Sequence, residues 1–149
     1  MRKFLFKIGL GFVGLFFLLL VVSALFPFSG NHFRNGAKRV STRNEIKMMT
    51  WILNDYIKSN DHLPVGGNAA IISALSATYT NDFHPFIPGP TSGLLTNSSG
   101  ELVDYWQVPF QIQIVGTTNF ILRSAGKDKI FGDADDIIFN SVSNDFVKP

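Results

Sequence analysis

Hydrophobic side chains recur at helical spacing in the stretch that follows residue 41. The apolar positions are three or four residues apart along much of this stretch, at Ile46, Met49, Leu53, Tyr56 and Ile57. This spacing places them on one face of a helix, and such a face needs a second element to pack against. The pattern therefore predicts a long amphipathic helix that covers part of a hydrophobic core.

Polar residues mark both expected ends of this helix. Thr42 and Glu45 have the spacing of a capping box, so the helix is expected to begin at Ser41 or Thr42. The Asn-Asp-His-Leu-Pro sequence at residues 60–64 is expected to stop it. The preceding residues 27–40 are interrupted by proline and glycine and carry positive charge, so we expect a basic linker there.

A second, shorter helix is predicted over about residues 68–76. Its inner face would carry Ala69, Ile72 and Leu75. The residues that follow, 80–99, are rich in proline, glycine and small polar residues, and are expected to be mostly loop.

Alternating apolar and polar residues predict strands in the last third of the chain. Residues 109–115 read as a half-buried strand, 116–119 as a hairpin turn and 120–123 as the returning strand. A short last strand is expected at residues 137–139. The chain from residue 41 onwards is therefore predicted to be an α+β domain, with a helix packed on a small antiparallel sheet.

An uncharged apolar run occupies residues 8–26, after three basic residues. At about 1.5 Å per residue in a helix, the run nearly matches a hydrocarbon core of about 30 Å. We expect it to anchor the protein in the membrane, although the small residues Ser23 and Ala24 also resemble a signal-peptidase site. The basic amino terminus favours a cytoplasmic start and an exported domain at residues 41–149.

The net charge of +2 over 149 residues is the sum of two segments of opposite charge. Seven of the 13 Lys and Arg residues lie in residues 1–43, where there is no acid, and all 11 acids lie in residues 44–149. The acidic half has the wrong sign of charge for phosphate backbones, so no nucleic-acid partner is expected. Cysteine is absent, which excludes disulfides and thiolate metal sites.

Four aspartates gather within nine residues near the carboxy-terminal end, between two predicted strands. They are Asp128, Asp133, Asp135 and Asp136, and Gly126 and Gly132 stand beside them. Glycine permits the tight turns that direct several oxygen atoms toward one point. Oxygen ligands on a flexible loop favour calcium over magnesium. The pattern indicates a calcium site, and the alternative is a solvated acidic turn.

Three segments, in order, resemble the major pseudopilin of type II secretion systems. The turn at residues 60–64 after Tyr56 resembles the end of that family's long helix. Residues 100–110 resemble its Asp-Pro-Trp-Gly-x-Pro-Tyr segment, and residues 120–137 resemble its final stretch, in which Ser-x-Gly-x-Asp precedes an aspartate-rich loop. The resemblance covers roughly residues 42–140.

The resemblance implies a pilin-like fold, a calcium ion in the last loop and a structural role without enzymatic activity or a small-molecule substrate. Partners would be like subunits, other pseudopilins and secretion components. The protein would cross the bacterial inner membrane once, through residues 8–26, with its domain in the periplasm. By the same resemblance the ligands would be the side chains of Asp128 and Asp135, backbone carbonyls near Leu122, Ala125 and Ile130, and Asp133 or Asp136 directly or through water.

The sequence also departs from the family pattern. Tyr105 and Gln107 replace the proline and glycine that flank the family's tryptophan. Gly11 and Phe12 imitate the family's cleavage point, but Phe16 stands where a glutamate is usual, and the first acid of the chain is Glu45. These differences suggest an atypical anchor that is not processed.

The residues of the acidic loop also fit other functions. The acidic loop resembles glycine-aspartate repeats of calcium-binding β-rolls, but such folds need about three or more stacked repeats. A calcium-binding module unrelated to secretion remains an alternative, as does a metal-dependent hydrolase that uses the aspartates. Against catalysis, His32, His62 and His84 share no ligand spacing with one another or with the aspartates.

Overall fold

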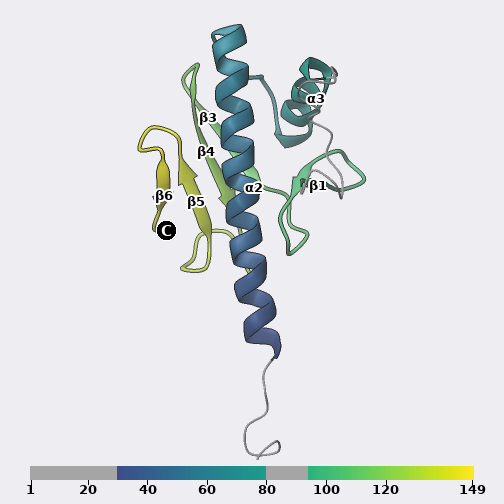
Figure 1. Ribbon diagram of the computed structural model, residues 1–149, viewed down its shortest axis with the longest axis vertical. Coiled ribbons are helices and arrows are strands. Elements are labelled where there is room, and N and C mark those ends of the chain that lie inside the picture. The colour runs from purple at the N-terminus through teal and green to yellow at the C-terminus, as the bar shows by residue number, and fades with distance from the viewer. Residues whose placement is uncertain (1–29, 80–93) are drawn as a thin grey trace, which may run out of the picture. The chain divides into compact units, whose positions relative to one another are not determined.

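The computed structural model describes residues 30–79 and 94–149, and the chain divides into two compact units between Arg34 and Asn35. The second unit is an α+β domain with one long helix and small antiparallel sheets (Figure 1). In chain order the described elements are α2 (Gly30–Asn60), α3 (Asn68–Thr78), β1 (Leu95–Thr96), β2 (Leu102–Val103), β3 (Gln111–Val115), β4 (Asn119–Ser124), β5 (Ile137–Asn140) and β6 (Asp145–Val147).

Helix α2 begins about three turns before the position expected from the sequence, which was Ser41 or Thr42. It is helical from Gly30, so the prediction of a linker up to residue 40 is wrong for residues 30–40. A helix that has already formed adds residues at low cost, because only its first turn is hard to nucleate. The glycine at position 36 costs about 1 kcal/mol relative to alanine, which a helix of 31 residues tolerates.

The predicted capping box is also wrong. Thr42 and Glu45 lie inside α2 and are both buried, so neither is at a helix terminus. The other end of the helix is as expected. Asn60 is the last helical residue, and Asp61 takes a left-handed conformation with φ 61° and donates its backbone N–H to the carbonyl of Ile57.

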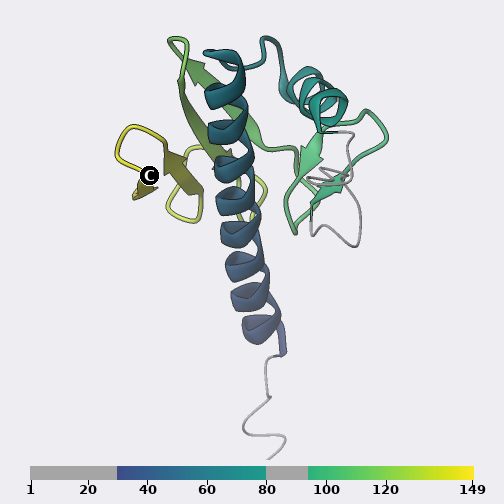
Figure 2. The ribbon, with the colours of Figure 1, turned by 45° about the horizontal axis from the view of Figure 1, so that its top comes forward.

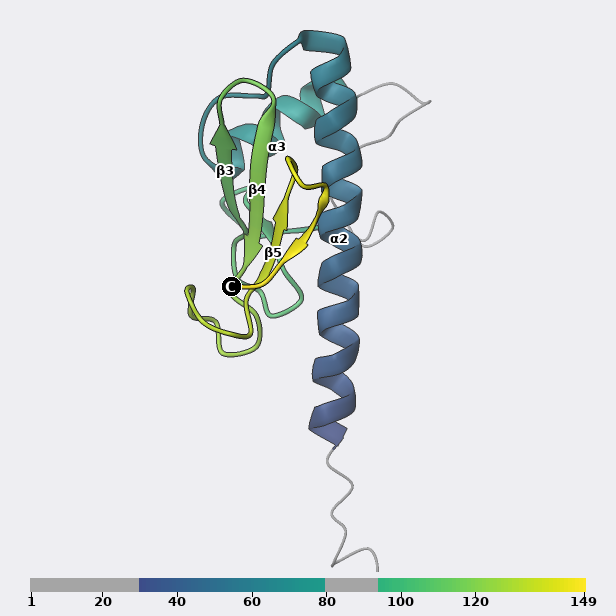
Figure 3. The same ribbon diagram turned by 90° about the vertical axis from the view of Figure 1, so that its left-hand side faces the viewer.

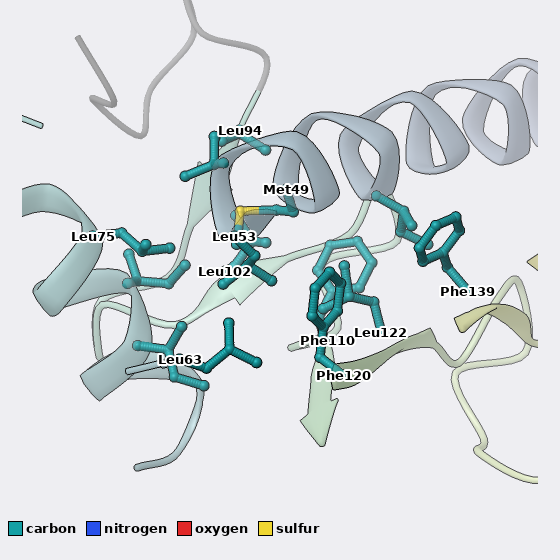
Figure 4. Packing of buried hydrophobic residues seen from close by; sticks show 14 of the residues in the cluster. Met49, Leu53, Leu63, Leu75, Leu94, Leu102, Phe110, Phe120, Leu122 and Phe139 are labelled. Carbon is teal, nitrogen blue, oxygen red and sulfur yellow. The ribbon is translucent and has the colours of Figure 1, made fainter. Parts of the chain in front are cut away.

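The inner face of α2 is the one that the hydrophobic pattern predicts. Ile46, Met49, Leu53 and Tyr56 are all buried, and Leu53 has no exposed surface. Met48 and Trp51, on other faces of the helix, are exposed. In Figure 4, Met49 and Leu53 point from α2 into a cluster of side chains from the rest of the domain.

Helix α3 confirms the second predicted helix and extends it to Thr78. Ile72 and Leu75 are buried as expected, while Ala69 is only half-buried. The side chain of Asn68, the first residue of α3, bonds to β2: its amide donates to the carbonyl of Leu102 and accepts from the same residue's N–H. This pair of bonds fixes the start of α3 against the short sheet.

The predicted hairpin is confirmed as β3 and β4, which belong to a sheet of order β3-β4-β5-β6. All its neighbours are antiparallel, with Ile112 opposite Leu122 and Ser124 opposite Ile137. Figure 3 shows β3, β4 and β5 alongside α2. The expectation that residues 137–139 form the last strand is wrong, because the chain turns back and β6 pairs with β5.

A second sheet was not predicted. Strands β1 and β2 have two residues each and pair antiparallel, with Leu95 opposite Val103. They lie on the same side of α2 as α3, away from the larger sheet (Figure 2). Part of the predicted loop, residues 80–93, falls outside the described residues.

One hydrophobic core joins α2, α3 and both sheets. Its buried members are Ile46, Met49, Ile52, Leu53, Tyr56, Leu63, Ile71, Ile72, Leu75, Leu94, Leu102, Trp106, Phe110, Phe120, Leu122, Ile137 and Phe139. The core therefore holds the ends of β4 and β5 in fixed positions, and the acidic loop connects those two ends.

Among residues 30–79 and 94–149, no helix has the length and apolar character needed to cross a bilayer. The expected anchor at residues 8–26 lies outside the described part of the chain.

Candidate metal centre

The acidic loop connects two paired strands, as the sequence predicts. It leaves β4 after Ser124 and enters β5 at Ile137, and these two residues are partners in the ladder. The loop forms a wide excursion at one end of the sheet in Figure 3. Since both ends of the loop are fixed by the ladder, its side chains can be held in a defined arrangement.

Three of the four aspartates converge. Asp128, Asp133 and Asp135 each offer a carboxylate oxygen, and these oxygens all lie within 4.8 Å of one another. Asp128 is exposed, whereas Asp133 and Asp135 are partly buried. Like charges at such separations repel, and a cation between them would turn the repulsion into attraction.

Backbone N–H groups hold one oxygen of each converging carboxylate. Asp135 Oδ2 accepts from the N–H of Lys127 at 2.6 Å and from that of Asp128 at 3.2 Å. Asp128 Oδ1 accepts from Ile130 N–H at 2.8 Å, and Asp133 Oδ1 accepts from Asp135 N–H at 2.9 Å. Such bonds fix the orientation of each carboxylate, and its second oxygen has no bond to a residue in the described part of the chain.

Gly126 permits the closest approach within the loop. Its φ is +69°, and a Cβ built at this position would overlap the carbonyl oxygen of Asp135 and lie 2.8 Å from the Oδ2 atom of the same residue. Both observations require glycine here. Lys129 also has a left-handed backbone, with φ 67°, which completes the turn around Asp128.

Helix α2 bonds directly to the loop. Arg39 Nη1 donates to the backbone carbonyl of Asp135 at 3.0 Å, across 96 residues of sequence. The sequence does not predict this contact, because residues 27–40 read as a linker. No local pattern signals it, since the bond depends on where the sheet places the loop.

Asp136 does not join the other three aspartates. Its side chain has no exposed surface, and its Oδ2 accepts from Gly132 N–H at 2.8 Å and lies 3.9 Å from Arg123 Nε. Its Oδ1 is buried without a hydrogen-bond partner in the described part of the chain. Asp136 therefore bonds within the base of the loop, and a direct role in binding the ion has no support from its position.

The three residues expected to offer carbonyls lie at different places. Leu122 is within β4, paired with Ile112 on one side and Phe139 on the other. Ala125 is buried and directly follows β4, and Ile130 is exposed on the loop beside Asp128. Their role as ligands stays a prediction.

A buried polar cluster that the sequence did not reveal supports the start of the loop. Asp104 is fully buried, and its Oδ1 accepts from the N–H groups of Trp106 and Val108. Its Oδ2 accepts from the Ser124 hydroxyl at 2.6 Å, and the same hydroxyl oxygen accepts from Gly126 N–H at 3.1 Å. Asp104 thus connects the turn after β2 to the first residues of the loop.

Glu45 lies in the same region and carries a strongly perturbed carboxyl group. It is buried, and neither carboxyl oxygen has a hydrogen-bond partner among the described residues. Burial, together with the charge of Asp104, raises the pKa of Glu45 to about 8. The sequence did not indicate that this residue is buried. Its spacing from Thr42 matched a helix cap, and a cap is expected at an exposed helix end.

The donor set of the loop is entirely oxygen. Of the three histidines, His62 lies at the end of α2, where its Nδ1 is 2.9 Å from the carbonyl oxygen of Leu63. The side chains of His32 and His84 lie outside the described residues. Carboxylate ligands without sulfur or nitrogen suit hard cations such as calcium, magnesium or manganese.

No family model matches the sequence, and comparisons with curated proteins and with solved structures find no similar protein.

Proposed function

We propose that the protein is an envelope-tethered structural subunit of the pseudopilin kind, in which calcium stabilises the loop at residues 125–136. The observation that carries the proposal is the convergence of three carboxylates on a loop whose two ends are paired strands. The long helix α2 packed against a small antiparallel sheet is consistent with a pilin-like domain. The apolar run at residues 8–26 would be the tether.

Asp128, Asp133 and Asp135 would hold the ion through their side chains. Calcium is favoured over magnesium because an irregular loop with flexible carboxylates tolerates the six to eight ligands of calcium, whereas magnesium demands a nearly octahedral shell and keeps its waters. Backbone carbonyls of the loop and water would complete the shell. When bound, the ion would supply structural support and no catalytic step.

Calcium is tested by thermal unfolding of the full chain in a non-ionic detergent with calcium, with magnesium and with chelator. An ion that binds only the folded state stabilises it by about 2.7 kcal/mol at 100 times its Kd. Asp135→Asn keeps the shape of the side chain but removes its charge, so most of the calcium-dependent rise in Tm should disappear. Identical melts in all three conditions would leave a solvated acidic turn as the better interpretation.

Asp61→Asn is the matched control for this experiment. Asp61 is an exposed aspartate outside the loop, and its left-handed backbone suits asparagine equally well. The substitution removes the same charge and should leave the calcium-dependent rise intact. If both variants lost the rise equally, the effect would come from overall charge and not from a site in the loop.

The structural role is tested separately, on the protein in its native membranes. A subunit anchored through residues 8–26 should stay in the membrane fraction after washes with high salt and carbonate. Mass spectrometry of the mature amino terminus then distinguishes three states: Met1 for an unprocessed anchor, Phe12 for a pilin-type subunit and Leu25 for a released domain. A start at Leu25 would favour a secreted calcium-binding module unrelated to secretion machinery.

A further inference from the structure

A cleft with a positively charged lining lies between α2 and the carboxy-terminal strand, and Ala134 and Asp136 of the acidic loop form part of its wall. It has a volume of about 550 Å³, and its lining includes Arg39 and Arg43 from α2 and Lys148, which follows β6. None of these three cations forms an ion pair within the described residues, whose one ion pair joins Arg123 and Asp136.

The two arginines are held ready to bind an anion. They are four residues apart on α2, so they lie one helical turn apart on the same face. Arg39 uses one N–H group for the carbonyl of Asp135, at 3.0 Å. Arg43 lies over the ring of Phe146, with its Cζ 4.2 Å from the ring centroid, which fixes the plane of the guanidinium and leaves its edge for other partners.

Asp136 also lines the cleft, but among the described residues it forms no ion pair with either arginine. Its side chain has no exposed surface and lies against Arg123 and the N–H of Gly132. The accessible side-chain charge of the cleft is therefore positive, while the rest of the domain is acidic. Two guanidinium forks and one ammonium around a single cleft form the pattern that recognises the tetrahedral oxygens of phosphate.

We propose that this cleft binds a phosphate group, carried either by a soluble phosphate ester or by a lipid headgroup. The proposed site uses cations and not the carboxylates of the cluster, although Arg39 also bonds to the carbonyl of Asp135, and it needs neither calcium nor assembly into filaments. Arg39 and Arg43 would each offer N–H groups to phosphate oxygens, and Lys148 would add a third positive charge from the opposite wall.

The test uses the full chain in a detergent without phosphate, with chelator present so that no calcium phosphate forms. Isothermal titration at low ionic strength measures binding of two probes, inorganic phosphate and a short-chain phosphatidylglycerol. Either probe supports the proposal if it binds and if Arg39→Gln/Arg43→Gln weakens its binding about tenfold or more, equivalent to about 1.4 kcal/mol. Tighter binding of the lipid identifies a headgroup site, and tighter binding of inorganic phosphate identifies a soluble ester.

Two further variants separate the cleft from general charge effects. Lys47→Gln/Lys58→Gln removes two exposed positive charges from α2 outside the cleft and should change the Kd less than about twofold if contacts within the cleft dominate. The Lys148 side chain forms no hydrogen bond or ion pair with the described residues, so Lys148→Gln keeps the test valid even if the double arginine variant is unstable, and it should weaken binding severalfold.

Three results would overturn the proposal. The first is that both probes bind with a Kd in the millimolar range or weaker. The second is that the two double variants weaken binding equally, which would indicate diffuse attraction to a basic helix. The third is that sedimentation shows that Arg39→Gln/Arg43→Gln abolishes self-association while phosphate binding is unchanged. The cleft would then be a contact for acidic side chains of a second copy.

Discussion

Replacing Glu45 by glutamine should make the protein more stable at neutral pH, and the reason lies in the environment of the carboxyl group. Only 3% of Glu45 is exposed, and its two carboxyl oxygens have no hydrogen-bond partner among the described residues. Burial, and then the nearby Asp104, raises its pKa from 4.5 to about 8. At neutral pH the folded chain therefore keeps a proton on Glu45 that the unfolded chain releases.

The sign of the effect follows from this difference in proton binding. As pH rises above 4.5, the unfolded state loses the proton and gains stability relative to the folded state, and the trend ends above about pH 8. One pH unit corresponds to about 1.4 kcal/mol, so Glu45 lowers the free energy of unfolding by at most about 3 kcal/mol between pH 4.5 and 7. Glutamine has nearly the same shape and no proton to exchange, so this loss should vanish.

The assay is urea denaturation of the full chain at a series of pH values from 5 to 8.5, followed by tryptophan fluorescence. The quantity of interest is the difference in unfolding free energy between wild type and Glu45→Gln at each pH, because contributions of other groups cancel in it. That difference should grow with pH and level off near 8. The exposed Asp61→Asn serves as control for the removal of one carboxylate, and the difference for Glu45→Gln should depend on pH more steeply than the difference for this control. A flat difference for Glu45→Gln would refute the reasoning.

The remaining predictions concern packing and backbone geometry, each measured as the change in unfolding free energy by urea denaturation. Leu53→Ala removes a side chain with no exposed surface and should cost about 2 to 5 kcal/mol; a cost below about 1 kcal/mol would show that the core around α2 is not packed as described. Gly126→Ala forces a Cβ against Asp135 at positive φ, so it should cost about 1 to 3 kcal/mol, and unchanged stability would mean that this turn is different in solution. Gly36→Ala places a Cβ in open space on α2 and should stabilise the protein by about 0.5 to 1 kcal/mol; destabilisation would argue against a helix at this position.

Features with a local period could be predicted from the sequence. The apolar spacing from Ile46 to Tyr56 identified the buried face of α2, and the alternation in residues 109–115 identified β3. The convergence of Asp128, Asp133 and Asp135 also had a local signal, since two glycines and four aspartates lie within residues 126–136. In each case the side chains that matter are close in sequence, and for the helix and the strand their geometry follows from the backbone period.

The features that were missed depend on contacts between distant parts of the chain. Strands β1, β2 and β6 have only two or three residues each, too few to show a period. Thr42 and Glu45 matched the pattern of a cap, but both are buried inside α2, and Thr42 Oγ1 accepts from the N–H of Tyr105 in the turn after β2. The bond from Arg39 to the loop requires both α2 and the sheet to be in place, so no window of sequence contains it.

The hydrogen bonds around Asp104 have a consequence for how the domain opens. One carboxylate holds the amides of Trp106 and Val108 directly and that of Gly126 through the hydroxyl of Ser124. Breaking any of these bonds in the buried interior leaves a partner unsatisfied, so the turn and the start of the loop are expected to open together. The three amides would then exchange their hydrogens with solvent as one cooperative unit, although they lie up to 20 residues apart along the chain.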